Sequence, residues 1–557
     1  MVTFFIQKIS YVNLLRLLLL FVSTLSFLSA CTSEDESTSD NILKISVGAA
    51  PQTLDPHLVS GVPAIKVLEA LSESLVDLDL DTYEIIPGAA ESWLVSDDGL
   101  SYVFKLRKNA RWSNGDRVRA NDYVYAWRRA FMPSVGWLYA LDYYFIVGAE
   151  AIHTGESKDL TTLGVRAIDE STLVFELNKP YPLFLKQLSS NRSAPIHQRA
   201  LETHGAIDDV GSKWTNPGNY VTNGPFKLKS WELNKIIVLE KNPYYWDAEA
   251  VKLDEIHIYP IESEALEERA FRSGQIQVAH GGRIPVDKIA SYKEKQPDKL
   301  RIVNGFATYF YNLNVSKPPL DNVLVRRALA HAIDRESLVH NITKAGELPA
   351  SAFNPPLIPA YNALLTPLKY DIAHAKTLLS EAGYPNGEGF PTLTLSYNTS
   401  ELHRKVALAV QQMWRQNLGI DVELENQEWK VFLNTRKNLQ FDIARAGSVS
   451  DIADPQDFLF SYTSGHGMND SGWSNPEYDT LVKKAAYTVD ESERYKLLAE
   501  AEETLLKEMP LIPFFYSAYS YLIANNVKNL KFNALERIRF KDIYIDHSQL
   551  PAKDANP

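Results

Sequence analysis

The sequence predicts an α/β protein with two or more lobes. Strand-like and helix-like patterns alternate along the chain after residue 41, with no internal repeat and no long low-complexity stretch. The chain has 557 residues, of which 45% are apolar. That is more apolar sequence than a single hydrophobic core can use, so the chain is expected to divide into lobes.

The clearest unit lies between residues 392 and 424. Residues 392–397 alternate apolar and polar side chains, as a strand does. Residues 402–414 repeat apolar side chains at helical spacing, and Gly419 is placed to end this helix. Residues 420–424 alternate again. A strand, a helix and a strand at this spacing predict two parallel strands joined by a right-handed crossover.

Other elements follow from the same reasoning. Residues 371–383 predict a helix with an aspartate cap and a closing glycine, and residues 326–339 predict a second helix. Residues 441–447 predict a strand, followed by a loop over residues 448–455. Large α/β proteins bind ligands beyond the carboxyl ends of strands or between lobes, so this loop is a candidate place for a site.

The N-terminus predicts export. Lys8 and Arg16 precede an apolar run over residues 17–28, and small residues follow it, so residues 1–30 are expected to be a signal peptide. A transmembrane anchor is the alternative, but the run is shorter than the roughly 20 residues that a span needs. The ending Leu28-Ser29-Ala30-Cys31 resembles the bacterial lipobox, which predicts lipidation of Cys31.

Composition excludes several classes of function. Cys31 is the only cysteine, so the folded body would hold no disulfide, thiolate metal ligand or cysteine nucleophile. Polar residues dominate after it, and residues 31–43 are expected to form the lipidated cysteine and a flexible tether. The net charge of −12 does not favour a basic face for phosphate backbones, so no nucleic acid partner is expected.

We find no pattern typical of an enzyme. The chain lacks G-x-S-x-G, H-E-x-x-H, Walker and G-x-G-x-x-G motifs, and its 12 histidines show no metal-ligand spacing. Asp97-Asp98-Gly99 favours a surface turn over a calcium loop. We therefore expect no catalytic residues, no metal site and no cofactor. Catalytic groups that converge from distant segments stay an open alternative.

Several segments, in order along the chain, resemble the family 5 extracellular solute-binding proteins. The segments are residues 102–116, 120–127, 242–247, 325–335 and 375–384. A second set resembles the oligopeptide-binding members of that family. This set comprises Leu54-Asp-Pro-His57, residues 61–63, 221–224, 397–403, 426–429 and 442–447, and Asp451.

The resemblance implies a fold with three lobes. It is the periplasmic-binding-protein-like fold (type II, cluster C), in which a cleft closes about a hinge. Residues 44–73, 198–305 and 518–557 are expected to form lobe I. Residues 74–197 are expected to form lobe II, and residues 306–517 lobe III.

The resemblance also implies a function. The protein would be a periplasmic, membrane-anchored monomer that captures short peptides and passes them to the permease and ATPase subunits of an ABC importer. The peptide would lie extended between lobes I and III and pair its backbone with strands on each side. Those strands are expected at Ser60, Gly61 and Val62, and at Gly447, Ser448 and Val449. A dipeptide or murein-peptide receptor of the same family is one alternative, and a surface peptide hydrolase or chaperone-like lipoprotein is another.

Charged residues in the matching segments are candidate partners for the peptide termini, because an unpaired buried ion is costly. The resemblance implies that Asp451 holds the α-ammonium group. It implies that Arg445, Arg436 and His403 meet the terminal carboxylate at different peptide lengths, a task that suits the planar guanidinium. A helix cap or a loop turn is the alternative for Asp451, and an ordinary ion pair is the alternative for Arg445.

Aromatic residues are candidates for the pocket walls. By resemblance, Tyr139 and Trp429 would line water-filled pockets that accept varied side chains, with core packing as the alternative. Ser448 stands where relatives carry a tryptophan, which could widen one pocket.

The chain also departs from its relatives at other positions. Some relatives carry a disulfide at the positions of Ala307 and Val449. A lysine of the family site falls on Thr343, with Lys344 adjacent, which puts recognition of the shortest peptides in doubt.

Overall fold

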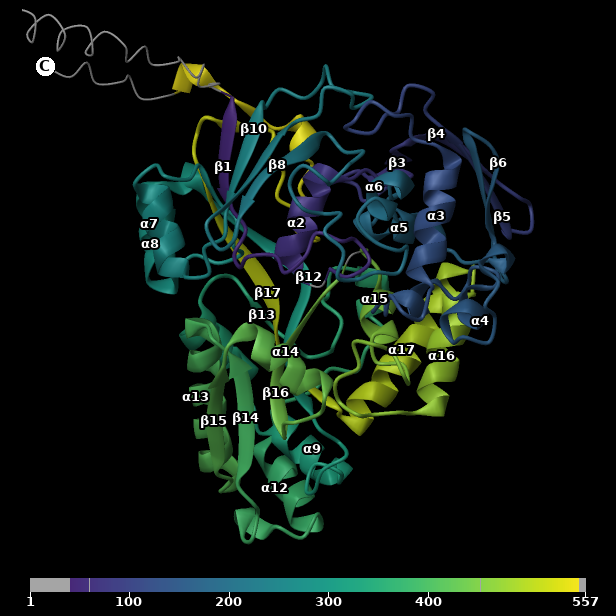
Figure 1. The fold of residues 1–557 in the computed structure, drawn as a ribbon. Coiled ribbons are helices and arrows are strands. Elements are labelled where there is room, and N and C mark those ends of the chain that lie inside the picture. The colour runs from purple at the N-terminus through teal and green to yellow at the C-terminus, as the bar shows by residue number, and fades with distance from the viewer. Residues whose placement is uncertain (1–40, 60, 451, 550–557) are drawn as a thin grey trace, which may run out of the picture. The chain divides into compact units, whose positions relative to one another are not determined.

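The structure is a computed structural model that describes residues 41–59, 61–450 and 452–549. Its main sheet contains strands from distant parts of the chain (Figure 1). In sheet order these strands are β15 (Val422–Gln427), β14 (Leu393–Asn398), β16 (Ile443–Val449), β12 (Leu300–Leu313), β17 (Leu511–Ile523), β11 (Val278–Ala279), β1 (Ile42–Ser46), β10 (Glu255–Tyr259), β9 (Ile236–Lys241) and β8 (Phe226–Glu232), and β13 (Leu348–Pro349) pairs with β17.

Two long strands, β12 and β17, connect the two halves of this sheet (Figure 1). They pair along their length, but the register shifts between Asn304 and Thr308 of β12. A side chain at Gly305 would place its Cβ 2.2 Å from the ring of Tyr519, so the close approach of the strands there requires glycine. An irregular register in two shared strands is a suitable place for a hinge. The boundaries that we expect between lobes I and III, at residues 305–306 and 517–518, fall in this stretch.

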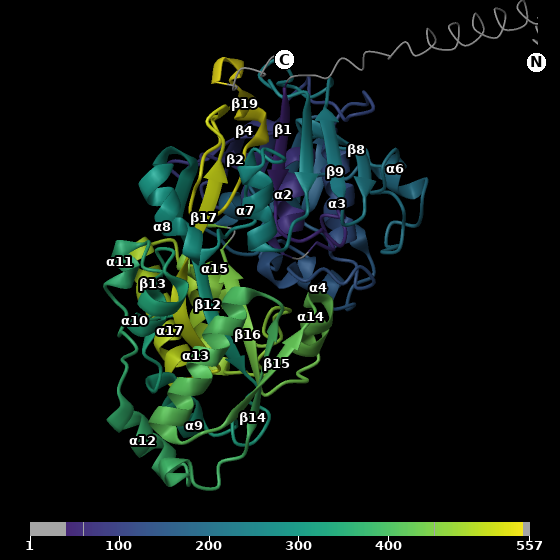
Figure 2. The same cartoon turned by 90° about the vertical axis from the view of Figure 1, so that its left-hand side faces the viewer.

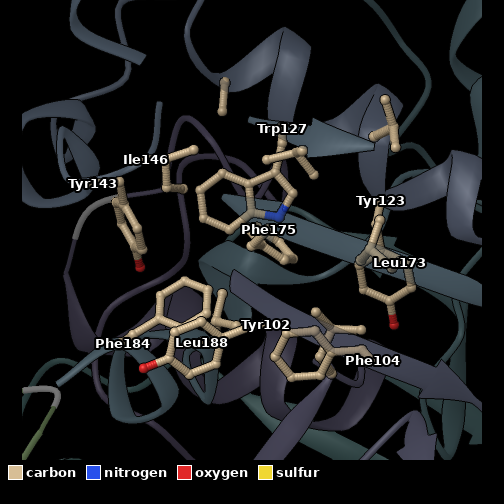
Figure 3. Close-up of a cluster of buried hydrophobic side chains, with 14 of the residues drawn as sticks. Tyr102, Phe104, Tyr123, Trp127, Tyr143, Ile146, Leu173, Phe175, Phe184 and Leu188 are labelled. Carbon is tan, nitrogen blue, oxygen red and sulfur yellow. The ribbon is translucent and has the colours of Figure 1, made fainter. Parts of the chain in front are cut away.

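A second sheet, entirely antiparallel, is built from residues 90–176. Its order is β4 (Ala90–Val95), β5 (Ser101–Leu106), β7 (Thr172–Glu176) and β6 (Val165–Asp169). An aromatic core packs between this sheet and α3 (Ala120–Ala130), as Figure 3 shows. Trp127 of α3 meets Phe175 edge to ring at 5.6 Å, and Tyr102 meets Phe184 at 4.4 Å. Strand β5 alternates buried and more exposed residues, whereas the first four residues of β7 are all buried, so the sheet buries one face against the helix.

The predicted βαβ unit is confirmed. Strands β14 and β15 pair in parallel, and α13 (Glu401–Leu418) connects them. Gly419 ends α13 in the left-handed conformation, at φ 72°. Side chains of α13 share one hydrophobic cluster with those of β14 and β16. Figure 2 shows α13 in the same half of the molecule as these strands. The helix predicted over residues 371–383 is also confirmed as α12 (Ile372–Glu381), capped by Asp371.

The single helix predicted over residues 326–339 is wrong. The chain forms α9 (Val323–His331), then α10 (Arg335–Ser337) and a π-helical turn (Leu338–Thr343). Asp334 causes the break, because its carboxylate accepts the Ser337 N–H and starts a new helix. Arg335 donates to two carbonyls at the end of the first helix and so stabilises the break.

Two predicted boundaries also differ. Strand β16 continues through Ser448 and Val449, because both residues pair with β12. The residue pattern predicted a loop there, whereas the family resemblance implied the strand that is found. Strand β1 begins at Ile42, within the expected tether, because Ile42 pairs with Glu255. The predicted signal peptide, Cys31 and most of the tether lie outside the described residues.

The remaining helices cover the sheets or connect their strands. They are α2 (Val62–Leu71), α4 (Ala149–His153), α5 (Phe184–Leu188), α6 (Gln198–Glu202), α7 (Glu264–Arg272), α8 (Val286–Lys295), α11 (Pro359–Asn362), α14 (Trp429–Lys437), α15 (Pro455–Phe460), α16 (Pro476–Ala486) and α17 (Glu491–Glu508). Two short strand pairs complete the fold: β2 (Val76–Leu78) with β3 (Ile85–Pro87), and β18 (Val527–Lys528) with β19 (Tyr544–Ile545). Within the described part of the chain, no helix has the length and apolar character needed to cross a membrane.

Candidate functional site

One edge of β16 is uncovered over most of its length. On one side β16 pairs with β12 from Ile443 to Val449, whereas on the other side β14 pairs only with Ile443 and Ala444. In the described chain no strand pairs with residues 445–449 along that second edge. Gly447 and Val449 are exposed there. An unpaired edge presents backbone N–H and C=O groups that can pair with an added strand.

Arg445 lies beside this edge without a carboxylate partner. Its guanidinium is 5.1 Å from the ring centre of Tyr309, and Tyr309 stacks on Phe515 at 4.5 Å. No described carboxylate forms an ion pair with Arg445, and its Nε has no hydrogen-bond acceptor. Burial lowers the pKa of Arg445, and the nearby cations Arg436 and Arg283 add to this effect. A half-buried cation in this state favours an anionic ligand.

Arg436 differs from Arg445, because it already has an internal partner. Its guanidinium is 2.6 Å from a carboxylate oxygen of Asp470, and both side chains are largely buried. Burial raises the pKa of Asp470, while the charge of Arg436 opposes this rise. An ordinary ion pair was the alternative for Arg445, but the structure shows such a pair at Arg436 instead. The Nε of Arg436 still lacks an acceptor among the described residues.

His403 of α13 is buried next to Arg445. Its Nδ1 lies 3.3 Å from the hydroxyl of Tyr309. Burial, followed by the charges of Arg445 and Arg283, lowers the pKa of His403 well below its usual value. His403 is therefore neutral near pH 7 and can offer a hydrogen bond but no charge. The sequence pointed to His403 and Arg445 but not to Tyr309. Tyr309 and Tyr311 alternate along β12, and this spacing was the one signal that could have placed both rings on the same face of the strand.

The segment that leads to Gly61 is anchored by a buried ion pair. Arg129 of α3 donates to both carboxylate oxygens of Asp55, at 2.9 and 2.6 Å. Trp214 donates to the same carboxylate at 3.2 Å, and His57 Nδ1 lies 2.9 Å from Arg129. Burial, together with the charge of Arg129, lowers the pKa of His57 to about 3. The segment 54–57, which carries part of the family resemblance, is thus a structural anchor.

The strand expected at Ser60, Gly61 and Val62 is wrong for the two residues that the structure describes. Gly61 is the N-cap of α2, with φ 87°, and Val62 is the first residue of the helix. Pro63 in the first turn explains this start, because its fixed φ suits a helix and it has no N–H to donate. Ser60 lies outside the described residues.

Asp451 also lies outside the described residues, but both of its neighbours are buried. The Ser450 N–H donates to the carbonyl of Phe306 at 2.9 Å, which attaches this end of β16 to β12. Ile452 is 3% exposed and packs with the aromatic core of residues 90–188.

The two aromatic candidates are half-buried at the edges of hydrophobic clusters. The guanidinium of Arg192 lies 3.7 Å from the ring centre of Tyr139. Trp429 lies 6.4 Å from the ring of Phe432. Ala307 and Val449, the positions of the disulfide in some relatives, face each other in register across β12 and β16. Thr343 is buried and donates to the carbonyl of Val339.

Side chains of residues 74–197 contact side chains of residues 306–517 directly. Asp142 and His466 form an ion-pair contact at 2.9 Å. The amide of Gln456 donates to the hydroxyl of Tyr181 at 2.9 Å. The lobes II and III that we predict therefore touch in this structure.

Comparison with known proteins establishes the family. The model of the bacterial extracellular solute-binding proteins, family 5, matches residues 84–470. The periplasmic oligopeptide-binding protein OppA of Escherichia coli is 37% identical over 485 residues, which cover 86% of this chain and 87% of OppA. The chain belongs to the family 5 solute-binding proteins. Members of this family bind solutes for transport and are not enzymes.

Solved structures of the family confirm the predicted fold. MppA, the murein tripeptide binding protein of Escherichia coli, has a TM-score of 0.85 at 32% identity, covering 91% of this chain and 99% of MppA. Haemophilus influenzae OppA in complex with the peptide RPPGFSPFR has a TM-score of 0.84 at 33% identity, with coverage of 91% and 99%. An MppA structure described as the unliganded open form scores only 0.66, with coverage of 91% and 98%. The arrangement of this chain is therefore more similar to that of OppA in complex with a peptide than to that of the unliganded open form of MppA.

Proposed function

We propose that this family 5 protein captures short oligopeptides between lobes I and III and delivers them to the permease and ATPase subunits of an ABC importer. One observation carries the proposal: an uncovered strand edge carries a half-buried arginine without a carboxylate partner among the described residues. The relatives that support it are named as oligopeptide-binding, dipeptide-binding and murein peptide-binding proteins.

In this proposal the peptide adds to the uncovered edge of β16. Backbone pairing there gives affinity whatever the side chains are, so recognition depends little on peptide sequence. Arg445 binds the terminal carboxylate and neutral His403 adds a hydrogen bond, while Asp451 pairs with the α-ammonium group. Arg436 serves longer peptides. Residues that contribute backbone or pocket walls are Ser60, Gly61, Val62, Gly447, Ser448, Val449, Tyr139 and Trp429.

Closure about the shared strands retains the ligand. Bending at residues 305–306 and 517–518 would move lobe III against lobe I and lobe II against lobe III. A peptide shifts the population to the closed form by its stronger binding to that form. The lobe boundaries given above are part of this proposal.

The experiment that tests the function is calorimetry of the wild-type protein with trialanine and with N-acetyl-trialanine. Acetylation removes the ammonium charge and would leave Asp451 unpaired, which is expected to cost roughly 3–5 kcal/mol of affinity. Trialanine should be recovered intact after binding. Equal affinity for both peptides would remove Asp451 from the site, and hydrolysis of trialanine would favour the peptide hydrolase.

A murein-peptide receptor is the second candidate, because this chain is so similar in structure to MppA. Competition between trialanine and a murein tripeptide separates the two candidates. An oligopeptide receptor should bind both with comparable affinity, whereas a murein-peptide receptor should bind trialanine at least a hundredfold more weakly.

We also propose that the protein is a periplasmic lipoprotein, exported by residues 1–30 and anchored through Cys31. The relatives are named as periplasmic proteins, which supports export. Cys31→Ser is expected to abolish labelling with radioactive palmitate and to leave the signal peptide attached. Labelling that persists in this variant would contradict the lipid anchor.

A further inference from the structure

Arg283 is a cation of lobe I that reaches toward lobe III. It lies in the loop between β11 and α8, which is fixed to β17 because the Ile284 N–H donates to the hydroxyl of Ser520 at 2.8 Å. The Arg283 guanidinium donates to the Glu347 carboxylate at 2.9 Å. The side chain of Glu347 is completely buried, and its other oxygen accepts the Ala345 N–H at 2.8 Å. Glu347 therefore holds Arg283 in one position.

A series of contacts connects that position to Arg445. The residues that follow Glu347 form β13, which pairs with Tyr516 and Phe515 of β17. Phe515 stacks on Tyr309, the ring above which the Arg445 guanidinium lies. After burial, the charge of Arg283 contributes to the lowered pKa values of both Arg445 and His403. Arg283 and Arg445 thus belong to different predicted lobes, and both charges act on His403.

Buried hydrogen-bond donors on β12 and β16 lack acceptors among the described residues. The hydroxyl of Tyr311, which faces Arg445 in the strand register, is buried and has no described partner. The Nε of Arg445 is in the same state. Buried donors without an acceptor indicate a ligand that brings acceptor oxygens.

We propose that Arg283 is a specificity-determining residue of the peptide site, which together with Arg445 clamps the terminal carboxylate of a short peptide across lobes I and III. This inference rests on the proposed function and deepens it. The charge count supports it: Arg283, Arg436 and Arg445 are three cations, whereas only Glu347 and Asp470 contact them as carboxylates among the described residues. A ligand carboxylate supplies the missing negative charge.

The test uses trialanine and trialanine amide, which differ only in the terminal carboxylate. Calorimetry with Arg283→Gln is expected to show at least a tenfold loss of affinity for trialanine and less than a twofold change for the amide. Glu347→Gln keeps the acceptor for the Ala345 N–H but removes the competing charge. It is therefore expected to bind trialanine at least as tightly as the wild type.

The controls separate the failure of this inference from the failure of the proposed function. Arg269→Gln changes an exposed arginine of α7 and should leave both affinities unchanged. If Arg283 only forms a structural ion pair at the hinge, Arg283→Gln and Glu347→Gln will weaken both peptides to the same extent, which overturns the inference alone. If the wild-type protein binds neither peptide, the proposed function fails as well.

Discussion

Replacing Arg445 by methionine is expected to weaken binding of trialanine at least a hundredfold, or by about 2.7 kcal/mol. The arginine lies beside the uncovered edge of β16 and has no carboxylate partner in the described chain. A ligand carboxylate that loses it would be buried without a counter-charge, and breaking a buried pair in this way costs several kcal/mol. Calorimetry at pH 7 measures the change.

The same variant should be more stable than the wild type when no peptide is present. Burial disfavours the charged form of Arg445, so its lowered pKa marks a cost to the folded state. Methionine removes this cost and is expected to add about 1 kcal/mol to the free energy of unfolding. Trialanine amide, which has no terminal charge, should lose much less affinity than trialanine. An equal loss for both peptides would show that Arg445 does not meet the carboxylate.

Replacing Asp55 by alanine is expected to lower the free energy of unfolding by about 3–5 kcal/mol. Arg129 is completely buried, and both of its bonds to a carboxylate go to Asp55. Removal of Asp55 leaves an uncompensated buried charge, which is far more costly than the loss of the bond itself. Urea denaturation followed by tryptophan fluorescence measures the effect.

An exposed ion pair provides the matched control for this variant. Glu232 lies 2.6 Å from Lys235, with both side chains more than half exposed, so Glu232→Ala should cost less than about 1 kcal/mol. If Asp55→Ala is no more destabilising than Glu232→Ala, the Asp55–Arg129 pair is not the anchor of the segment that leads to Gly61.

Local patterns in the sequence predicted the parts of the fold that local chemistry decides. Apolar alternation and a closing glycine predicted β14, α13 and β15, because each of these features acts within a few residues. The helix over 326–339 failed because periodicity does not reveal that the Asp334 side chain competes for a backbone N–H. The strand at Gly61 and Val62 failed because backbone pairing was assumed where Pro63 starts a helix.

The site was only partly accessible to sequence reasoning. Arg445, Arg436 and His403 lie in matching segments, and the resemblance pointed to all of them. What distinguishes Arg445 from Arg436 is a partner distant in the sequence, Asp470, which only the folded chain reveals. Arg283 lies in no recognisable sequence motif. Its position depends on the loop that packs on β17 and on the ion pair with Glu347, and neither can be read from local sequence.

Hydrogen exchange of the β16 amides tests the central claim most directly. We expect saturating trialanine to slow exchange at least tenfold for those amides of residues 445–449 that point away from β12, because the peptide backbone pairs with them. Amides of β5, remote from this edge, should change little. If calorimetry shows that trialanine has saturated the protein while the amides of residues 445–449 exchange as fast as before, the peptide does not add to β16 and the account is contradicted.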